Sequence, residues 1–249
     1  MSADFDPGID EVAHRPWRMP DRPWVMTQSW HDLLFAHWKV DLRQLRSRVP
    51  SPFELDLFGG DAWLGVVPFY MTNVSPRGMP SLPWVSEFPE LNVRTYVRVA
   101  DKPGVYFFSL DAASALAVQT ARTLLNLPYH TATMMRLKTP RGVEYHSSRG
   151  GAAAQFDATY APVSPAFVPT AGSLEHFLTE RYCLYHVDHR GTPYRLDIHH
   201  RPWRLQVARA QIDRNTMAQV NGFDIDRPAD LLHFSERQDM VAWLPSTVL

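Results

Sequence analysis

The chain has 249 residues, of which 45% are hydrophobic and 12% aromatic, and it carries a net charge of −1. This length suits one large domain with a substantial core, and the near-neutral charge argues against binding to nucleic acid or to an anionic membrane surface. The single cysteine, Cys183, excludes an internal disulfide and fits a reducing compartment. No secretory signal and no bilayer-spanning apolar run is present, so we expect a cytoplasmic protein.

The first part of the chain predicts an arm followed by strands. Residues 1–26 are polar and rich in proline, which favours an extended N-terminal arm. Residues 29–40 and 62–71 have the aromatic and aliphatic content of strands. Pro68 lies inside the second of them, so we expect this strand to bend there or to lie at a sheet edge.

Three helices are predicted, each from a local signal. Asp41 can cap a short helix over residues 42–49, Ser173 can cap another, and residues 112–125 are rich in alanine and leucine without proline or glycine.

The stretch 88–96 carries the clearest sign of a site. Side chains alternate between the two faces of a strand, and four polar residues share one face: Glu90, Asn92, Arg94 and Tyr96. Together they can hold a small polar ligand. The alternative is a solvated face with a Glu90–Arg94 pair, and periodicity alone does not decide between the two. The proline-rich loop 76–89, with Trp84, is expected to form the pocket rim.

The remaining segments are mostly strands joined by turns. They comprise residues 105–110 after the turn 101–104, 133–139 with 143–148, 153–160, 181–187 with 194–199, 203–211 and 238–244. Hairpins rather than βαβ crossovers indicate an α+β fold in which antiparallel sheet dominates, closed as a barrel or sandwich.

Motifs for common cofactors are missing from the sequence. There is no glycine loop for a dinucleotide or phosphate, no nucleophile elbow and no zinc pattern, so we expect no cofactor. Asp197 and His199 share one strand face, and with His31 and His37 they could bind a divalent metal if they converged. Hydrogen-bonded histidines are the favoured alternative, and no metal is predicted.

A second candidate lies just after the longest predicted helix. Pro128 there precedes Tyr129 and His130, and a rigid turn presenting a phenol and an imidazole can supply a general acid or base. Tyr and His after a helix are common, so the signal is weak by itself.

Stretches along most of the chain resemble the DUF2071 (YqjF-like) family, a branch of the acetoacetate decarboxylase-like superfamily. The most specific runs are Glu-Leu-Asn-Val-Arg-Thr-Tyr at 90–96 and Phe-Phe-Ser-Leu-Asp-Ala at 107–112. The resemblance implies a single domain over 27–249, built as a mainly antiparallel, cone-shaped β-barrel with a few flanking helices and a buried ligand cavity. It also implies an acidic active-site position at Glu90.

One departure from that superfamily bears on mechanism. Its decarboxylases carry two neighbouring lysines after the turn proline, one of which forms a Schiff base, whereas this chain has Tyr129 and His130 there. A phenol cannot condense with a ketone to an imine, so Schiff-base decarboxylation is not expected.

We therefore expect a small oxygen-rich or anionic molecule in the cavity, with Arg94 pairing to a carboxylate or enolate. Asn92 orients the ligand, Trp84 forms an apolar wall, and Glu90, Tyr129 and His130 exchange protons in acid–base chemistry beside a carbonyl. One alternative is a non-catalytic binding or sensing barrel, and another is a metal-dependent enzyme using Asp197 and His199. Superfamily relatives self-associate, so the expected partners are a small molecule and further copies of the chain, without nucleic acid or membrane.

Overall fold

The computed structural model describes residues 4–79, 86–115, 118, 127–150, 154–188 and 190–248. The strands are β1 (Met26–Val40), β2 (Glu54–Leu55), β3 (Ala62–Pro76), β4 (Phe88–Val99), β5 (Lys102–Ala112), β6 (Tyr129–Thr131), β7 (Thr133–Thr139), β8 (Gly142–Ser148), β9 (Gln155–Pro162), β10 (Cys183–Val187), β11 (Pro193–His200), β12 (Gln206–Asn215), β13 (Leu231–Ala242) and β14 (Ser246–Thr247). The helices described are α1 (Leu42–Arg46), α4 (Leu174–Thr179) and α5 (Met217–Val220). None of the helices in these ranges is long and apolar enough to cross a bilayer.

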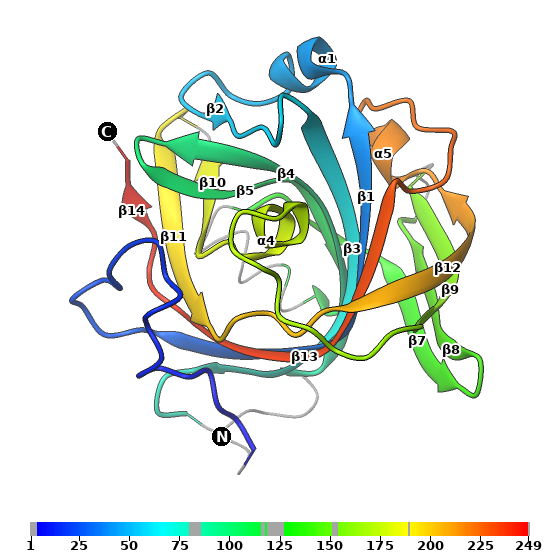
Figure 1. Ribbon diagram of the computed structural model, residues 1–249, viewed down its shortest axis with the longest axis horizontal. Helices are drawn as coiled ribbons and strands as arrows, with labels where there is room; N and C mark the ends of the chain where they lie inside the picture. The colour runs from blue at the N-terminus through cyan, green and yellow to red at the C-terminus, as the bar shows by residue number, and fades with distance from the viewer. Residues whose placement is uncertain are drawn as a thin grey trace.

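A ring of 7 strands organises the molecule (Figure 1). Its order is β11-β10-β5-β4-β3-β1-β13, and it closes where β13 pairs with β11 from Ile198↔Ala242 to His200↔Met240. Neighbours in the ring are antiparallel except β5 and β10, which are parallel over a short stretch. The mainly antiparallel fold expected from the sequence is confirmed, as a ring rather than a strict barrel.

The sheet continues beyond the ring through β12, β9, β8 and β7. The larger hydrophobic core lies between this extension and the outer face of the ring, where Leu91 and Val93 of β4 share one cluster with Phe156 and Tyr160. Side chains alternate along a strand, so burial of Leu91 and Val93 outside the ring turns the polar face of β4 inward.

Pro68 lies in the interior of the sheet, because β3 is paired on both sides, by β1 and β4. The β1–β3 register shifts between His31 and Ala36, and Asp32 within this interval has a φ of 52°. Proline has no N–H to give to a ladder, so the irregular pairing accommodates it. Of the two expectations for this position, the sheet edge is wrong.

Both predicted caps are present. Asp41 accepts a hydrogen bond from the backbone N of Gln44 at 2.7 Å, and Ser173 accepts one from His176 at 3.2 Å. Helix α1 is shorter than the predicted 42–49. The predicted helix 112–125 falls for the most part outside the described residues. Strand β13 begins well before the predicted 238–244, because its polar middle hid the first half of the strand.

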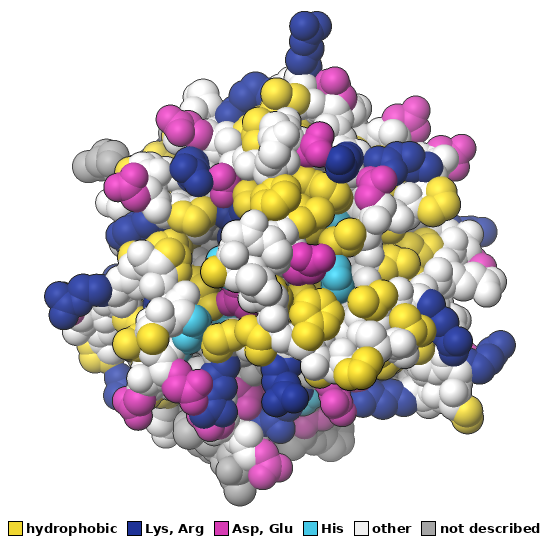
Figure 2. All heavy atoms as spheres, in the orientation of Figure 1, with side chains coloured by type: hydrophobic (Ala, Val, Ile, Leu, Met, Phe, Trp, Pro, Cys, Tyr) yellow, Lys and Arg dark blue, Asp and Glu magenta, His cyan; other side chains and the backbone are white. Residues whose placement is uncertain are grey.

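Helix α4 lies within the outline of the ring in the view of Figure 1. The Leu178 carbonyl accepts hydrogen bonds from Tyr96 at 2.9 Å and from Arg94 at 3.3 Å, which fasten the helix to β4. On this face, hydrophobic side chains gather toward the centre while most Lys and Arg side chains lie around the edge (Figure 2).

Candidate functional site

A cavity of about 100 Å³ lies inside the ring. Most of its lining is aliphatic, aromatic or methionine side chains. The polar side chains that face it come mainly from β4, β6 and the two ends of the β10–β11 hairpin, and include Glu90, Asn92, Arg94, Tyr129, Arg181 and His200. A mostly apolar pocket with a few convergent polar groups is typical of small-molecule sites.

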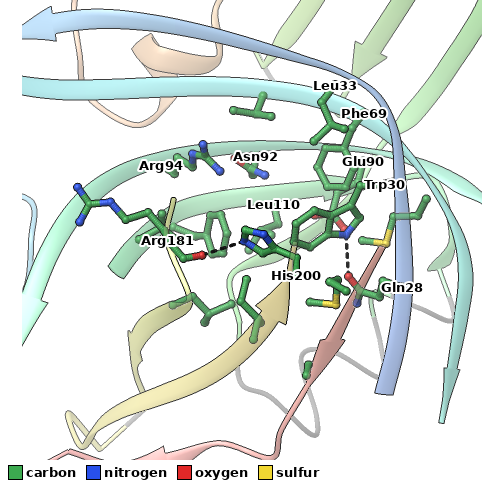
Figure 3. Close-up of a pocket in the computed structure, with 18 of the residues that line it drawn as sticks. Gln28, Trp30, Leu33, Phe69, Glu90, Asn92, Arg94, Leu110, Arg181 and His200 are labelled. Atoms are coloured by element: carbon green, nitrogen blue, oxygen red, sulfur yellow. Dashed lines mark hydrogen bonds between the residues drawn. The ribbon is translucent and has the colours of Figure 1, made fainter. Parts of the chain in front are cut away.

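Strand β4 supplies three of these groups in a row. Glu90, Asn92 and Arg94 project from alternate positions into the cavity (Figure 3). Asn92 is buried, and its Oδ1 has no hydrogen-bond partner among the described residues. Tyr96 continues the same face but is fully buried, where it donates to Leu178 and lies 2.6 Å from Nε2 of His37. Tyr96 therefore has a structural role, joining β4 to α4, and it does not line the cavity.

Glu90 is a buried carboxyl group, and the phenol of Tyr129 donates a hydrogen bond to its Oε2 at 2.9 Å. Burial raises the pKa of Glu90 to about 8, the hydrogen bond from Tyr129 lowers it, and nearby Asp111 raises it. Burial also raises the pKa of Tyr129 well above its ordinary value. A carboxyl group that stays protonated at neutral pH can act as a general acid.

Arg94 is a cavity cation for which the described residues provide no anionic partner. Its contacts are the Leu178 carbonyl and the rings of Phe35 and Tyr96, whose centroids lie 5.3 and 5.9 Å from the guanidinium carbon. Among the described residues no carboxylate forms an ion pair with Arg94, and its Nε is buried without a partner. A partly buried, unpaired guanidinium is suited to a ligand carboxylate, which it can bind through two hydrogen bonds.

The sequence did not reveal several cavity residues. Arg181 lines the cavity but is neutralised by Asp56, with Nη1 and Oδ2 2.6 Å apart. Trp30 and Trp203 stack with their ring centroids 5.9 Å apart and form an aromatic wall. His200 lines the cavity beside them, stacked on Tyr182.

A signal for His200 was present in the alternation of β11. Because Asp197 and His199 share one face of this strand, Ile198 and His200 share the other, and both of these line the cavity. The sequence alone did not indicate which face turns inward.

The other predicted site residues lie elsewhere. His130 follows Tyr129 directly in β6, so its side chain points to the opposite face; it is exposed and borders a depression outside the ring. Trp84 lies outside the described residues. The structure thus brings together Glu90, Asn92, Arg94 and Tyr129, and it separates His130 from them.

The candidate metal ligands do not converge. Asp197 contacts Arg195, and His199 contacts Arg15 and the Gly8 carbonyl. His31 contacts Thr72, and His37 contacts Tyr96. Over the described ranges there is no group of three or more His, Cys, Asp or Glu side chains placed to hold a metal ion. Each histidine is hydrogen-bonded within the protein, which was the alternative favoured from the sequence.

Comparison with known proteins gives similarity in both sequence and fold. The sequence model of DUF2071, described as an uncharacterized conserved protein, matches residues 27–239. The uncharacterized protein YqjF of Bacillus subtilis (strain 168) is 46% identical over 226 residues, covering 90% of this chain and 93% of that protein. The similar solved structures include acetoacetate decarboxylase from Legionella pneumophila, with a TM-score of 0.62, 13% identity and coverage of 100% of this chain and 98% of that one. Another is the enduracididine biosynthesis enzyme MppR complexed with pyruvate, with a TM-score of 0.62, 10% identity and 93% of each chain covered. At these identities the solved structures establish a shared fold.

Proposed function

The chain belongs to the DUF2071 family, and from this membership and the lining of its cavity we propose that it binds a small anionic or oxygen-rich molecule inside the ring. The observation that carries the proposal is Arg94, a cavity cation for which the described residues provide no carboxylate. A ligand carboxylate or enolate offers the missing negative charge, and Asn92 stands beside it to orient the ligand.

The apolar lining adds to the strength of this interaction. Phe35 and Tyr96 flank the guanidinium, and Trp30 and Trp203 wall the cavity further along. Charge pairs inside an apolar, water-poor site attract more strongly than pairs at the surface, since the effective dielectric constant is lower. The structurally similar enzyme MppR has been captured with pyruvate, which supports small oxo acids as the first compounds to test.

The same site has the groups for acid–base chemistry beside a carbonyl. Glu90, protonated at neutral pH, gives its proton to a substrate oxygen or to an enolate carbon, and the Tyr129 phenol stabilises the carboxylate that remains. The proposal gives His130 no part in this step, because its side chain lies on the outer side of the ring. The three lysines of the chain are all among the described residues and none of them lines the cavity, so the proposed chemistry does not pass through an imine.

Binding of pyruvate and other small carboxylates, measured by isothermal titration calorimetry, tests the proposal. Arg94→Gln should weaken binding by about 10- to 100-fold, the range expected for a lost hydrogen bond between charged groups. Arg141→Gln, which changes an exposed arginine that pairs with Glu144, should leave affinity unchanged. Full affinity in a folded Arg94→Gln variant would contradict the proposal.

A non-catalytic binding or sensing protein is the second candidate, because a binder needs Arg94 but no proton donor. Tyr129→Phe separates the two, since it keeps the ring and removes only the hydroxyl that contacts Glu90. Loss of turnover with retained affinity in Tyr129→Phe favours the enzyme. Unchanged affinity and unchanged turnover with every carboxylate tested favour the binder.

A further inference from the structure

Three side chains line the cavity on one side and an outer depression on the other: Phe107, Leu127 and Tyr129. We call these three residues the partition. The rest of the depression comes from residues of β5, β6 and β10 and the segment before β6, including Tyr106, His130 and His186. A single layer of side chains therefore separates the inside of the ring from the molecular surface at this point.

The backbone of the ring is also interrupted beside the partition. On the side away from β4, β5 pairs with β10 only at Val105 and Tyr106 and with β6 only from Leu110 onward. No described strand pairs with residues 107–109 on that side. The β4–β5 register shifts at the same place, where Phe108 is the extra residue of a bulge. Side chains can move apart here without breaking a ladder of backbone hydrogen bonds.

In the described part of the chain, the end of the ring beneath α4 shows no comparable gap. Leu178 is fully buried, and its carbonyl accepts hydrogen bonds from both Arg94 and Tyr96. Passage there would break these bonds and separate the helix from its apolar contacts, which is costlier than rotating side chains of the partition.

Tyr129 gives the partition a chemical role. Its hydroxyl holds the Glu90 carboxyl at 2.9 Å, so a rotation of the Tyr129 ring away from the cavity breaks this hydrogen bond. The same movement connects the buried carboxyl with the outer depression. Opening of the partition and solvation of Glu90 are therefore one event.

We infer that small molecules enter and leave the cavity through the partition, between β6 and β10, and that Tyr129 is the gate residue whose opening releases Glu90. The inference concerns access to the site proposed above and rests on that site being used. The route itself can be measured without a ligand, so its failure and the failure of the anion-binding proposal are distinguishable.

The test places a cysteine inside the cavity and measures how fast a small thiol reagent reaches it. Val67 is buried on β3 and lines the cavity without touching the depression, so Val67→Cys is the reporter and methyl methanethiosulfonate is the probe. The native Cys183 gives a slow background, because burial raises the pKa of its thiol to about 12 and the thiolate is the reactive form. In this background, Leu127→Ala should speed modification about tenfold and Tyr129→Phe about fivefold.

Leu196→Ala is the matched control, since Leu196 is a buried leucine that lines the cavity from β11 but does not reach the depression. Its rate should stay within about twofold of the reporter protein when only local opening at the partition matters. Equal acceleration by Leu196→Ala and Leu127→Ala would overturn the route. Because Leu127→Ala can also destabilise the fold, Tyr129→Phe is the second variant, and no acceleration in a folded Tyr129→Phe protein would overturn the gate. If the anion-binding proposal failed, the thiol-modification rates of these proteins would still be the same.

Discussion

The phenol of Tyr129 donates a hydrogen bond of 2.9 Å to Oε2 of Glu90, joining β6 to β4 over the strand β5 that lies between them. Burial raises the pKa of this carboxyl, the hydrogen bond from the phenol lowers it, and nearby Asp111 raises it. Burial is the largest of these effects, and the pKa is about 8. The contact therefore couples the position of Tyr129 to the protonation of Glu90.

Glu90 should give the folded protein a pH-dependent stability. Its pKa is raised from 4.5 to about 8, so between these values the folded state keeps a proton that the unfolded state releases. The stabilisation is complete below pH 4.5 and is lost as the pH rises through 8, by up to about 1.4 kcal/mol per pH unit. Glu90→Gln keeps a neutral side chain and should remove this slope, as measured by urea unfolding from about pH 5 to 8.5.

Glu87→Gln is the control for that measurement, because Glu87 is exposed and lies just before β4. It should leave the slope of stability against pH unchanged. A slope that persists in Glu90→Gln would assign the pH dependence to another group.

Tyr129→Phe should raise the pKa of Glu90 further, because the hydrogen bond that it removes is the effect that lowers it. The variant should also lose about 1 kcal/mol of unfolding free energy. Carbon NMR of labelled glutamate carboxyls measures the titration directly. Tyr145→Phe is the comparison, since Tyr145 donates to the Glu90 backbone carbonyl at 2.7 Å and not to its carboxyl. An upward shift in Tyr145→Phe but not in Tyr129→Phe would contradict the assignment.

Arg181 and Asp56 form a buried ion pair, with side chains 5% and 8% exposed, whereas Arg98, the second partner of Asp56, is 45% exposed. Arg181→Met leaves the Asp56 carboxylate buried with one half-exposed partner and should cost about 3 kcal/mol, measured by urea unfolding. Arg98→Gln should cost less than about 1 kcal/mol, because its charge is largely solvated. The double variant Arg181→Met, Asp56→Leu removes both buried charges and should recover most of this loss. Equal costs for the Arg181 and Arg98 variants would show that burial does not decide the energy of this network.

How far the sequence predicted the site can be seen on β4 and β6. The period of two on β4 placed Glu90, Asn92 and Arg94 together, and burial of the intervening Leu91 and Val93 turned them inward. The sequence predicted a turn at residues 129–130, which would present the Tyr129 and His130 side chains together. These residues form a strand instead, so they point to opposite faces of the sheet.

The rest of the cavity depends on ring closure, which no local pattern contains. Trp30 and Trp203 meet only because β13 pairs with both β1 and β11. Arg181 lies in the connection between α4 and β10, where no periodicity assigns it a face. The hydrophobic pattern predicted strands and their class, whereas the choice of the inner face on β11 follows from contacts far apart in sequence.

The N-terminal arm should be fastened to β11 by Arg15. Its guanidinium is buried, donates from Nη1 to the Ile198 carbonyl at 2.8 Å, lies 3.1 Å from Nδ1 of His199 and packs 4.7 Å from the Tyr182 ring centroid. Because Arg15 can only donate, Nδ1 of His199 accepts, and Nε2 donates to the Gly8 carbonyl at 2.9 Å. Arg15→Gln should therefore loosen the arm, with faster amide hydrogen exchange in residues 8–17.

Acid should loosen the same contact in the native protein. Burial lowers the pKa of His199 from 6.5 to about 4. The neutral ring therefore stabilises the fold above pH 6.5, and this contribution is lost as the pH falls through about 4. At that pH a proton on Nδ1 would face the Arg15 guanidinium. Hydrogen exchange in the arm, compared at about pH 7 and pH 4 after correction for the intrinsic rate, should show the loss of protection. Arg18→Gln, at an exposed position of the arm, should change neither result. Equal protection of the arm in the native protein and in Arg15→Gln would mean that Arg15 does not hold it. Its contacts with β13, such as the hydrogen bond of 2.9 Å from the Asp6 N–H to Asp239, would then be the ones that do.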